Sequence, residues 1–158
     1  MGGNKKSLGD LSTNFYSYEF RCPCPKCKRK KVRVSSLLLF KLEMLRAKLG
    51  DEPIYINSGN RCPEYNRTID GFPTSPHIPN PDGEAADIKM TELDPIDIGL
   101  AAEKIGGMRI GIGTNFVHLD VRKPNPSKYW IYENDIIYSG NIENESLLKF
   151  YRIIKEGK

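Results

Sequence analysis

The spacing of apolar residues predicts two well-defined helices in the first two thirds of the chain. The serine pair at 35–36 can cap the first helix, and Gly50 suits its end. Asp94 provides a capping carboxylate for the second helix, Pro95 suits its first position, and the glycine pair at 106–107 ends it. The predicted buried stripes are Leu38, Leu42, Leu45 and Leu49 in the first helix and Ile98, Ala101, Ala102 and Ile105 in the second.

Shorter segments of the pattern predict strands rather than helices. Runs rich in strand-forming residues occupy 54–57, 85–90, 108–112 and 116–121, and 129–138 is expected to be a hairpin around Glu133-Asn134-Asp135. A short helix from Pro63 to Gly71, a proline-rich loop over 72–84 and a C-terminal helix complete the pattern. The stripe of that last helix is Leu147, Phe150, Tyr151 and Ile154. Helices and strands without a regular βαβ rhythm indicate an α+β fold, with a small antiparallel or mixed sheet and flanking helices.

Composition fits one globular domain over residues 1–158. The chain has 39% apolar and 28% charged residues, a balance typical of a folded protein. Residues 1–34 are expected to form an irregular N-terminal segment. No apolar run approaches the roughly 20 residues of a membrane helix, and no apolar stretch suited to a secretory signal follows Met1. We therefore expect no membrane span and a protein that is cytoplasmic when made.

The formal net charge is +4, and much of the positive charge lies between Lys26 and Arg33. Such a cluster can contact nucleic acid or an anionic cell wall, but a solvated surface is the simpler interpretation. Nucleic acid is therefore not the partner we expect.

Three residues stand out as candidate metal ligands. In the strand at 116–121, alternation places His118 and Asp120 on the face opposite Val117 and Leu119. Asp87 likewise points away from its apolar neighbours, and a buried carboxylate needs a cation or a hydrogen-bond partner. His77 precedes Asp87 by ten residues, across the proline-rich loop. Two histidines and one carboxylate, with a fourth position open for water, describe a catalytic zinc site.

These residues lie in a pattern that resembles the M15 peptidases, the zinc D-Ala-D-Ala carboxypeptidases and their endolysin and hedgehog-fold relatives. The family pattern S-x-H-x-x-G-x-A-x-D followed by H-x-D is similar to Ser75-Pro76-His77, Gly83-Glu84-Ala85-Ala86-Asp87 and His118-Leu119-Asp120. Upstream, Ser58-Gly59-Asn60-Arg61 resembles the family's S-G-x-R segment. The likeness runs from about residue 11 to about residue 131.

The resemblance implies a hedgehog/DD-peptidase-like fold and roles for individual residues. His77, Asp87 and His118 correspond to the zinc ligands, and Arg61 to the arginine that receives the terminal carboxylate of the substrate. Ser75 matches the serine of the S-x-H element and is expected to help hold the substrate or the loop.

The chain departs from the family pattern in two places. Five residues separate His77 from Gly83 where the family has two, so the extra residues either bulge outward or let Asp82 compete with Asp87. Asn115 stands where many relatives have an acidic or histidine base. Asp120 is the first candidate to replace it, as a base or as a partner that orients an imidazole, and Glu84 is the second.

The four cysteines allow several states. Cys22, Cys24 and Cys27 are close in sequence, and Cys62 directly follows Arg61. A structural zinc, one or two disulfides, and free buried thiols all fit this arrangement. In each bridged state, Cys62 would brace the turn that carries Arg61.

The sequence therefore predicts a zinc metallopeptidase that hydrolyses peptidoglycan stem peptides or similar short peptides, as a D-Ala-D-Ala carboxypeptidase or an endolysin-like endopeptidase. One catalytic Zn²⁺ is expected, and a second structural ion is an open alternative. Family habit suggests a phage-encoded protein that acts on the cell wall after release. The alternative is a non-catalytic metal-binding or structural module that retains the peptidase fold.

Overall fold

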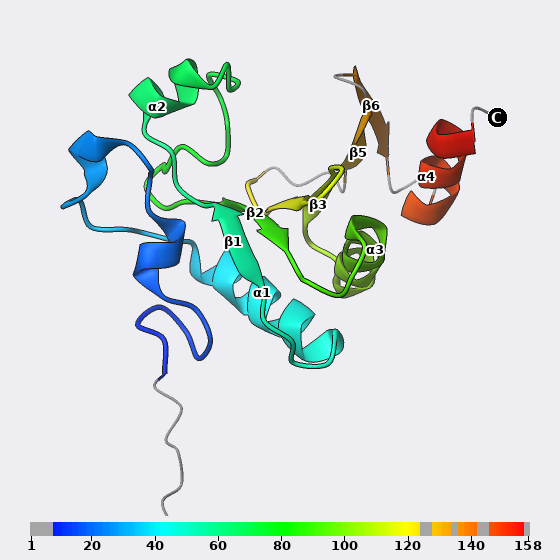
Figure 1. Ribbon diagram of the computed structural model, residues 1–158, viewed down its shortest axis with the longest axis horizontal. Helices are drawn as coiled ribbons and strands as arrows, with labels where there is room; N and C mark the ends of the chain where they lie inside the picture. The colour runs from blue at the N-terminus through cyan, green and yellow to red at the C-terminus, as the bar shows by residue number, and fades with distance from the viewer. Residues whose placement is uncertain (1–7, 124–127, 134–135, 142–145, 157–158) are drawn as a thin grey trace, which may run out of the picture.

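The computed structural model describes residues 8–123, 128–133, 136–141 and 146–156. Figure 1 shows its elements along the chain. They are two short 3-10 helices, η1 (Ser17–Phe20) and η2 (Pro25–Cys27), the helices α1 (Ser36–Lys48), α2 (Pro63–Thr68), α3 (Pro95–Ile105) and α4 (Leu147–Glu156), and the strands β1 (Tyr55–Ser58), β2 (Ala85–Lys89), β3 (Arg109–Ile112), β4 (Val117–Asp120), β5 (Lys128–Glu133) and β6 (Ile136–Asn141).

The six strands of the described chain form one mixed sheet in the order β1-β2-β4-β3-β5-β6. Neighbouring strands are antiparallel except β3 and β5, which are parallel. Together with the flanking helices, this arrangement confirms the predicted α+β fold. The predicted hairpin is present as β5 and β6, while Asn134 and Asp135 of its turn lie outside the described residues.

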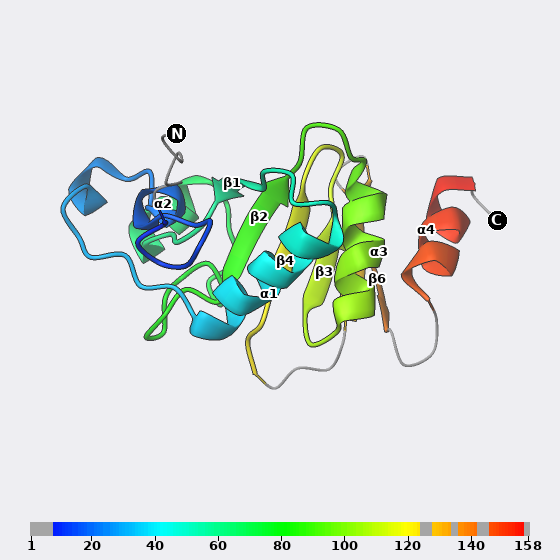
Figure 2. The same cartoon turned by 90° about the horizontal axis from the view of Figure 1, so that it is seen from below.

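Helices α1 and α3 lie across one face of the sheet (Figure 2). Their predicted stripes enter the core, where Leu38, Leu42, Ile98 and Ala102 are almost fully buried. The same core receives Ala86 and Ile88 from β2, Ile110 from β3, and Val117 and Leu119 from β4. Since side chains alternate along a strand, the residues between these apolar ones face the other side of the sheet.

The helix starts agree with the sequence, with one correction. Ser35 caps α1, because its hydroxyl oxygen accepts a hydrogen bond from the backbone N–H of Leu38. Asp94 precedes α3 as predicted, but its exposed carboxylate makes no cap bond. The backbone carbonyl of Asp94 accepts hydrogen bonds from Asp97 and Ile98 instead. Main-chain bonds and Pro95 therefore begin this helix.

The N-terminal segment is irregular apart from η1 and η2, and it is anchored to the rest of the fold. Phe15 and Phe20 are buried in the main core. Glu43 of α1 accepts hydrogen bonds from the Ser12 hydroxyl, the Asn14 backbone N–H and the Asn14 side-chain amide at 2.7, 2.8 and 2.7 Å. The described residues include no helix that is long and apolar enough to cross a membrane.

Candidate metal centre

His77, Asp87 and His118 come together on the sheet face opposite α1 and α3. Asp87 of β2 and His118 of β4 are directly opposite each other in the antiparallel pair. Directly opposite residues of two paired strands share a face, so their side chains meet. His77 reaches them from the loop between α2 and β2. Its backbone carbonyl accepts from the Arg61 N–H at 2.8 Å, and its backbone N–H donates to the Ser75 hydroxyl at 3.3 Å.

The three side chains present their ligand atoms as a small triangle. Nδ1 of His118 lies 3.1 Å from Nε2 of His77 and 2.8 Å from Oδ1 of Asp87. Nε2 of His77 lies 3.3 Å from the same carboxylate oxygen. Tetrahedral zinc with ligands at roughly 2.0–2.1 Å requires ligand atoms about 3.3 Å apart. The donor set and its spacing therefore fit a zinc ion with three protein ligands.

Each imidazole is oriented by its second ring nitrogen. Nδ1 of His77 lies 2.6 Å from the carbonyl oxygen of Gly59. A carbonyl only accepts, so Nδ1 carries the proton and Nε2 keeps a lone pair for a metal. Nε2 of His118 lies 3.2 Å from Oδ2 of Asp120, a fully buried carboxylate. Donation to this carboxylate leaves Nδ1 of His118 facing the triangle.

The charges around the triangle set its protonation. Burial would raise the pKa of Asp87, but hydrogen bonds with His118 and His77 hold that pKa well below its usual range. Burial lowers the pKa of His77. Burial would also lower the pKa of His118, yet the carboxylates of Asp120 and Asp87 raise it above the ordinary value. Asp87 is therefore ionised and His77 neutral at neutral pH, which are the states in which they bind a cation.

Arg61 makes contacts that the sequence does not reveal. Its Nη2 donates to Oδ2 of Asp87 at 2.7 Å, and its Nε donates to the Ser58 hydroxyl at 3.0 Å. One oxygen of Asp87 thus faces the histidines while the other is held by Arg61. The side chain of Arg61 is only 15% exposed, and it lines the cavity beside His77.

The triangle opens into a cavity of about 680 Å³. The cavity is also lined by residues that the sequence analysis did not single out as site residues: Phe72, Arg109, Phe116, Arg122, Trp130 and Tyr132. The Trp130 ring lies 5.2 Å from the His118 ring, centroid to centroid. Trp130 fits there because its neighbour in the sheet is Gly111, where a Cβ would lie 2.5 Å from the indole. The glycine within an apolar strand is the signal that sequence reading overlooked.

The structure separates the acidic candidates by position. Asp120 lies behind the His118 ring, and its Oδ1 is 3.4 Å from Nε of Arg122. Asp82 pairs with Arg33 at 2.7 Å, so the lengthened loop does not direct it toward the triangle. Glu84 is not among the described residues that line the cavity, and burial raises its pKa. Asp87 is the one carboxylate among the described cavity residues.

Comparison with known protein families agrees with the resemblance seen in the sequence. A family model described as peptidase M15 matches residues 13–120, about two thirds of the chain. The chain belongs to the peptidase M15 family. The matched region of this M15 peptidase contains Arg61, Ser75 and the whole triangle, whereas β5, with Trp130 and Tyr132, lies beyond it. Membership implies a peptidase. No curated protein matches the chain.

Proposed function

We propose that this M15 peptidase is a zinc enzyme that hydrolyses peptidoglycan stem peptides, as a D-Ala-D-Ala carboxypeptidase or an endolysin-like endopeptidase. The observation that carries the proposal is the triangle of His77 Nε2, Asp87 Oδ1 and His118 Nδ1 at the cavity. Three protein ligands beside an open cavity are typical of catalytic rather than structural zinc. A phage-encoded origin with action on the cell wall belongs to the proposal and rests on the family resemblance alone.

In this proposal, His77, Asp87 and His118 hold the ion. Bound zinc would supply Lewis acidity, which lowers the pKa of a water molecule toward roughly 7 and polarises the scissile carbonyl. The Gly59 carbonyl and the Asp120 carboxylate keep the two imidazoles in the correct tautomer and orientation. Because the His118 ring stands between Asp120 and the other two ligands, we assign Asp120 to positioning rather than to proton transfer.

Substrate recognition would use the positive charge of the cavity. Two N–H groups of Arg61 donate hydrogen bonds to Ser58 and Asp87, and its remaining donors are available to a terminal carboxylate. Arg109 and Arg122 line the same cavity. The Nε atom of Arg109 is buried without a hydrogen-bond partner among the described residues, whereas Arg122 faces Asp120 and donates to the Thr74 carbonyl. Ser75 supports the turn before His77 and also lines the cavity. These contacts support a peptide that ends in a free carboxylate.

The test compares wild type with His118→Ala, both supplied with zinc and checked for folding by circular dichroism. The substrates are a stem pentapeptide ending in D-Ala-D-Ala, the same peptide with a C-terminal amide, and its L-Ala-L-Ala counterpart. We expect wild type to release D-Ala from the first peptide and His118→Ala to be inactive. Cleavage of the amidated peptide at an internal bond would indicate endopeptidase action instead.

A non-catalytic module is the second candidate, and one observation favours it. The described cavity offers no carboxylate besides Asp87, so it lacks an evident general base. Zinc bound at the triangle without hydrolysis of any of these peptides, or of purified peptidoglycan, would favour this module over the enzyme.

A further inference from the structure

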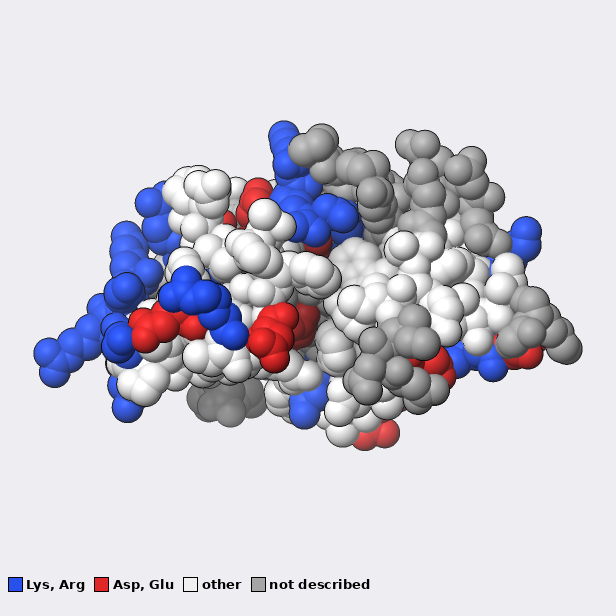
Figure 3. Space-filling model, turned by 90° about the horizontal axis from the view of Figure 1, so that it is seen from above, with Lys and Arg blue, Asp and Glu red and all other residues white. Residues whose placement is uncertain are grey.

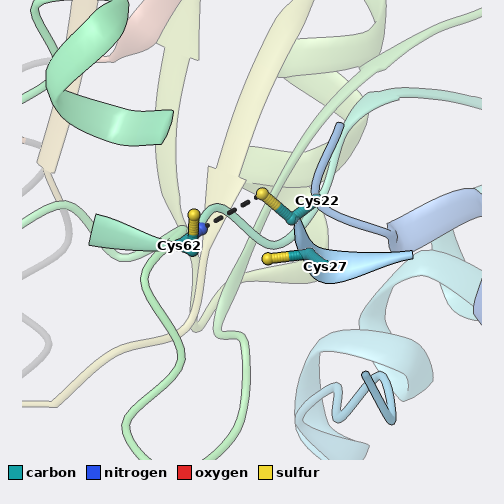
Figure 4. Close-up of side chains that lie close together, drawn as sticks. All are labelled: Cys22, Cys27 and Cys62. Atoms are coloured by element: carbon teal, nitrogen blue, oxygen red, sulfur yellow. Dashed lines mark hydrogen bonds between the residues drawn. The ribbon is translucent and has the colours of Figure 1, made fainter. Parts of the chain in front are cut away.

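Three of the four cysteines gather where the N-terminal segment meets the turn between β1 and α2. The sulfur atoms of Cys22, Cys27 and Cys62 all lie within 4.8 Å of one another (Figure 4). All four thiols are free, and Cys24 and Cys27 are 8% and 7% exposed. Residues that are 40 positions apart in sequence thus bring their thiols to one point.

The backbone around the cluster is shaped like a ligand loop. Two residues separate Cys24 from Cys27, and the 3-10 turn η2 joins the two cysteines through a hydrogen bond from the Cys27 N–H to the Cys24 carbonyl at 2.9 Å. A spacing of two residues is common in structural zinc sites. Backbone N–H groups also point at the sulfurs: the Cys62 N–H donates to Cys22 Sγ and the Tyr65 N–H to Cys62 Sγ, both at 3.3 Å. Such donation favours the thiolate, which is the form that binds metal.

Cys24 supplies the fourth thiol of the proposed site. Its sulfur is not among the three that lie within 4.8 Å of one another, but its carbonyl accepts the hydrogen bond from the Cys27 N–H and its side chain is buried in the same turn. Tetrahedral zinc with thiolates at roughly 2.3 Å requires sulfur atoms about 3.8 Å apart, so a small contraction of the cluster would complete the site.

We propose that Cys22, Cys24, Cys27 and Cys62 bind a structural zinc ion. Four protein ligands leave no open position, so this ion would hold chain segments together rather than act on substrate. It would join the N-terminal segment to Cys62, the residue that follows Arg61 and caps α2. The second zinc thereby clamps the turn that carries the arginine of the cavity.

The charge around the cluster suits this occupant. A zinc ion with four thiolates carries a formal charge of −2, which neighbouring cations stabilise. Lys26 lies within the ligand loop, and Lys28, Arg29, Lys30 and Lys31 follow it directly. Figure 3 shows Lys and Arg gathered at the end of the molecule that carries this segment. The basic run thus receives a local role that needs neither nucleic acid nor a cell wall.

The experiment uses the His118→Ala protein, in which the triangle has lost a ligand and only the cysteine site remains. We expect wild type to hold two zinc ions per chain and His118→Ala one. Cobalt in place of that zinc should show the strong sulfur-to-metal charge-transfer absorption of tetrahedral thiolate cobalt. An organomercurial reagent should release the remaining zinc from folded His118→Ala, which avoids reliance on a cysteine variant that fails to fold. Lys48→Ala in the same background is the matched control, since it removes an exposed lysine at the end of α1, outside the ligand loop, and should retain the zinc.

Two results would overturn the proposal. One is His118→Ala protein that is folded, zinc-supplied and free of zinc. The other is a disulfide between any two of the cysteines in wild type, seen by mass spectrometry after alkylation without reduction. Failure of the proposed function looks different: one zinc in wild type that survives His118→Ala and is released by the organomercurial would remove the catalytic metal and leave the cysteine site intact.

Discussion

The two candidate metal sites are held in different ways. The triangle is built on the sheet: Asp87 and His118 are paired across β2 and β4, and the second nitrogen of each histidine has its own partner. The cysteine cluster is built on a 3-10 turn and the turn before α2, and in the described part of the chain backbone N–H groups donate to two of its sulfurs. The first geometry comes from the fold, while in our proposal an ion would hold the second.

If both proposed sites bind zinc, a single chain would give its two metal ions opposite tasks. A site held rigidly by a sheet can leave one position open for chemistry, because it does not need the ion to stay assembled. A site made from irregular segments uses all of its ligands for cohesion, since binding free energy then becomes folding free energy. Gly59 lies where the two regions meet, because its carbonyl orients His77 and a Cβ added to it would lie 2.5 Å from the Cα of Phe20.

The largest effect is expected where the two regions touch. A Cβ at Gly59 would lie 2.5 Å from the backbone Cα of Phe20, an atom that cannot rotate away. Gly59→Ala must therefore shift either the N-terminal segment or the carbonyl that orients His77. We expect a loss of about 3 kcal/mol in the free energy of unfolding, at the upper end of the range for overpacking, and weaker zinc binding at both sites. Denaturant unfolding and zinc titration measure the two effects.

Gly99→Ala is the matched control for this change. Its Cβ would meet Cδ1 of Ile112 at 2.4 Å, but that atom is the end of a flexible side chain, and alanine is the better helix former within α3. We expect Gly99→Ala to stay within about 1 kcal/mol of wild type. Equal stability of Gly59→Ala and wild type would show that the two regions are not coupled through this contact.

Much of the site could be predicted from sequence because its signals are local. Alternation around His118 and Asp87 places both side chains on the face away from the core, and Ser35 marks the start of α1. The prediction of α+β from mixed helix and strand patterns is confirmed in the same way. These features depend on neighbours along the chain, where period and capping chemistry can be read directly.

The remaining features depend on contacts between distant residues. The parallel pairing of β3 with β5, inside an otherwise antiparallel sheet, follows from tertiary packing that no single strand encodes. The hydrogen bond from Arg61 to Asp87 joins residues 26 positions apart. Gly111 matters only because Trp130 lies against it in the folded sheet. Sequence periodicity carries no information on such pairs.

An intermediate effect is expected at Asp120, whose carboxylate orients the His118 ring of the triangle. Asp120→Asn keeps the shape of the side chain and removes the charge that faces Nε2 of His118. Loss of such a partner typically weakens metal binding by about 10- to 100-fold, or about 1.4–2.7 kcal/mol. We expect this loss at the triangle and none at the cysteine site, measured by competition with a chelator of known affinity.

The kcat of Asp120→Asn at saturating zinc shows whether Asp120 is a positioning residue or the general base. A positioning residue predicts that hydrolysis by Asp120→Asn recovers most of the wild-type kcat once zinc is saturating. A kcat that stays low at full zinc occupancy would instead make Asp120 the general base. Asp97→Asn, the same change at an exposed position in the first turn of α3, should alter neither zinc affinity nor kcat.

The smallest effect is expected at Glu43, which anchors the N-terminal segment that carries three of the four cysteines. Its carboxylate accepts three hydrogen bonds from Ser12 and Asn14, and the single amide oxygen of Glu43→Gln cannot replace both carboxylate oxygens. We expect a loss of about 1 kcal/mol in the free energy of unfolding at neutral pH and weaker zinc binding by the cysteines. The triangle should keep its affinity, because β2 and β4 do not depend on this anchor.

The stability that Glu43 contributes should depend on pH in a definite direction. Burial would raise the pKa of Glu43, but the hydrogen bonds from Asn14 and Ser12 lower it below the value in the unfolded chain. A carboxyl group of this kind contributes its full stability above the unfolded pKa and loses it as the pH falls through the folded pKa. The difference between wild type and Glu43→Gln should therefore shrink under acid, whereas the exposed control Glu52→Gln should match wild type throughout. If Glu43→Gln weakened the triangle as much as the cysteine cluster, the two sites would share one support, and the contrast between a site held by the sheet and a site held by its metal would fail.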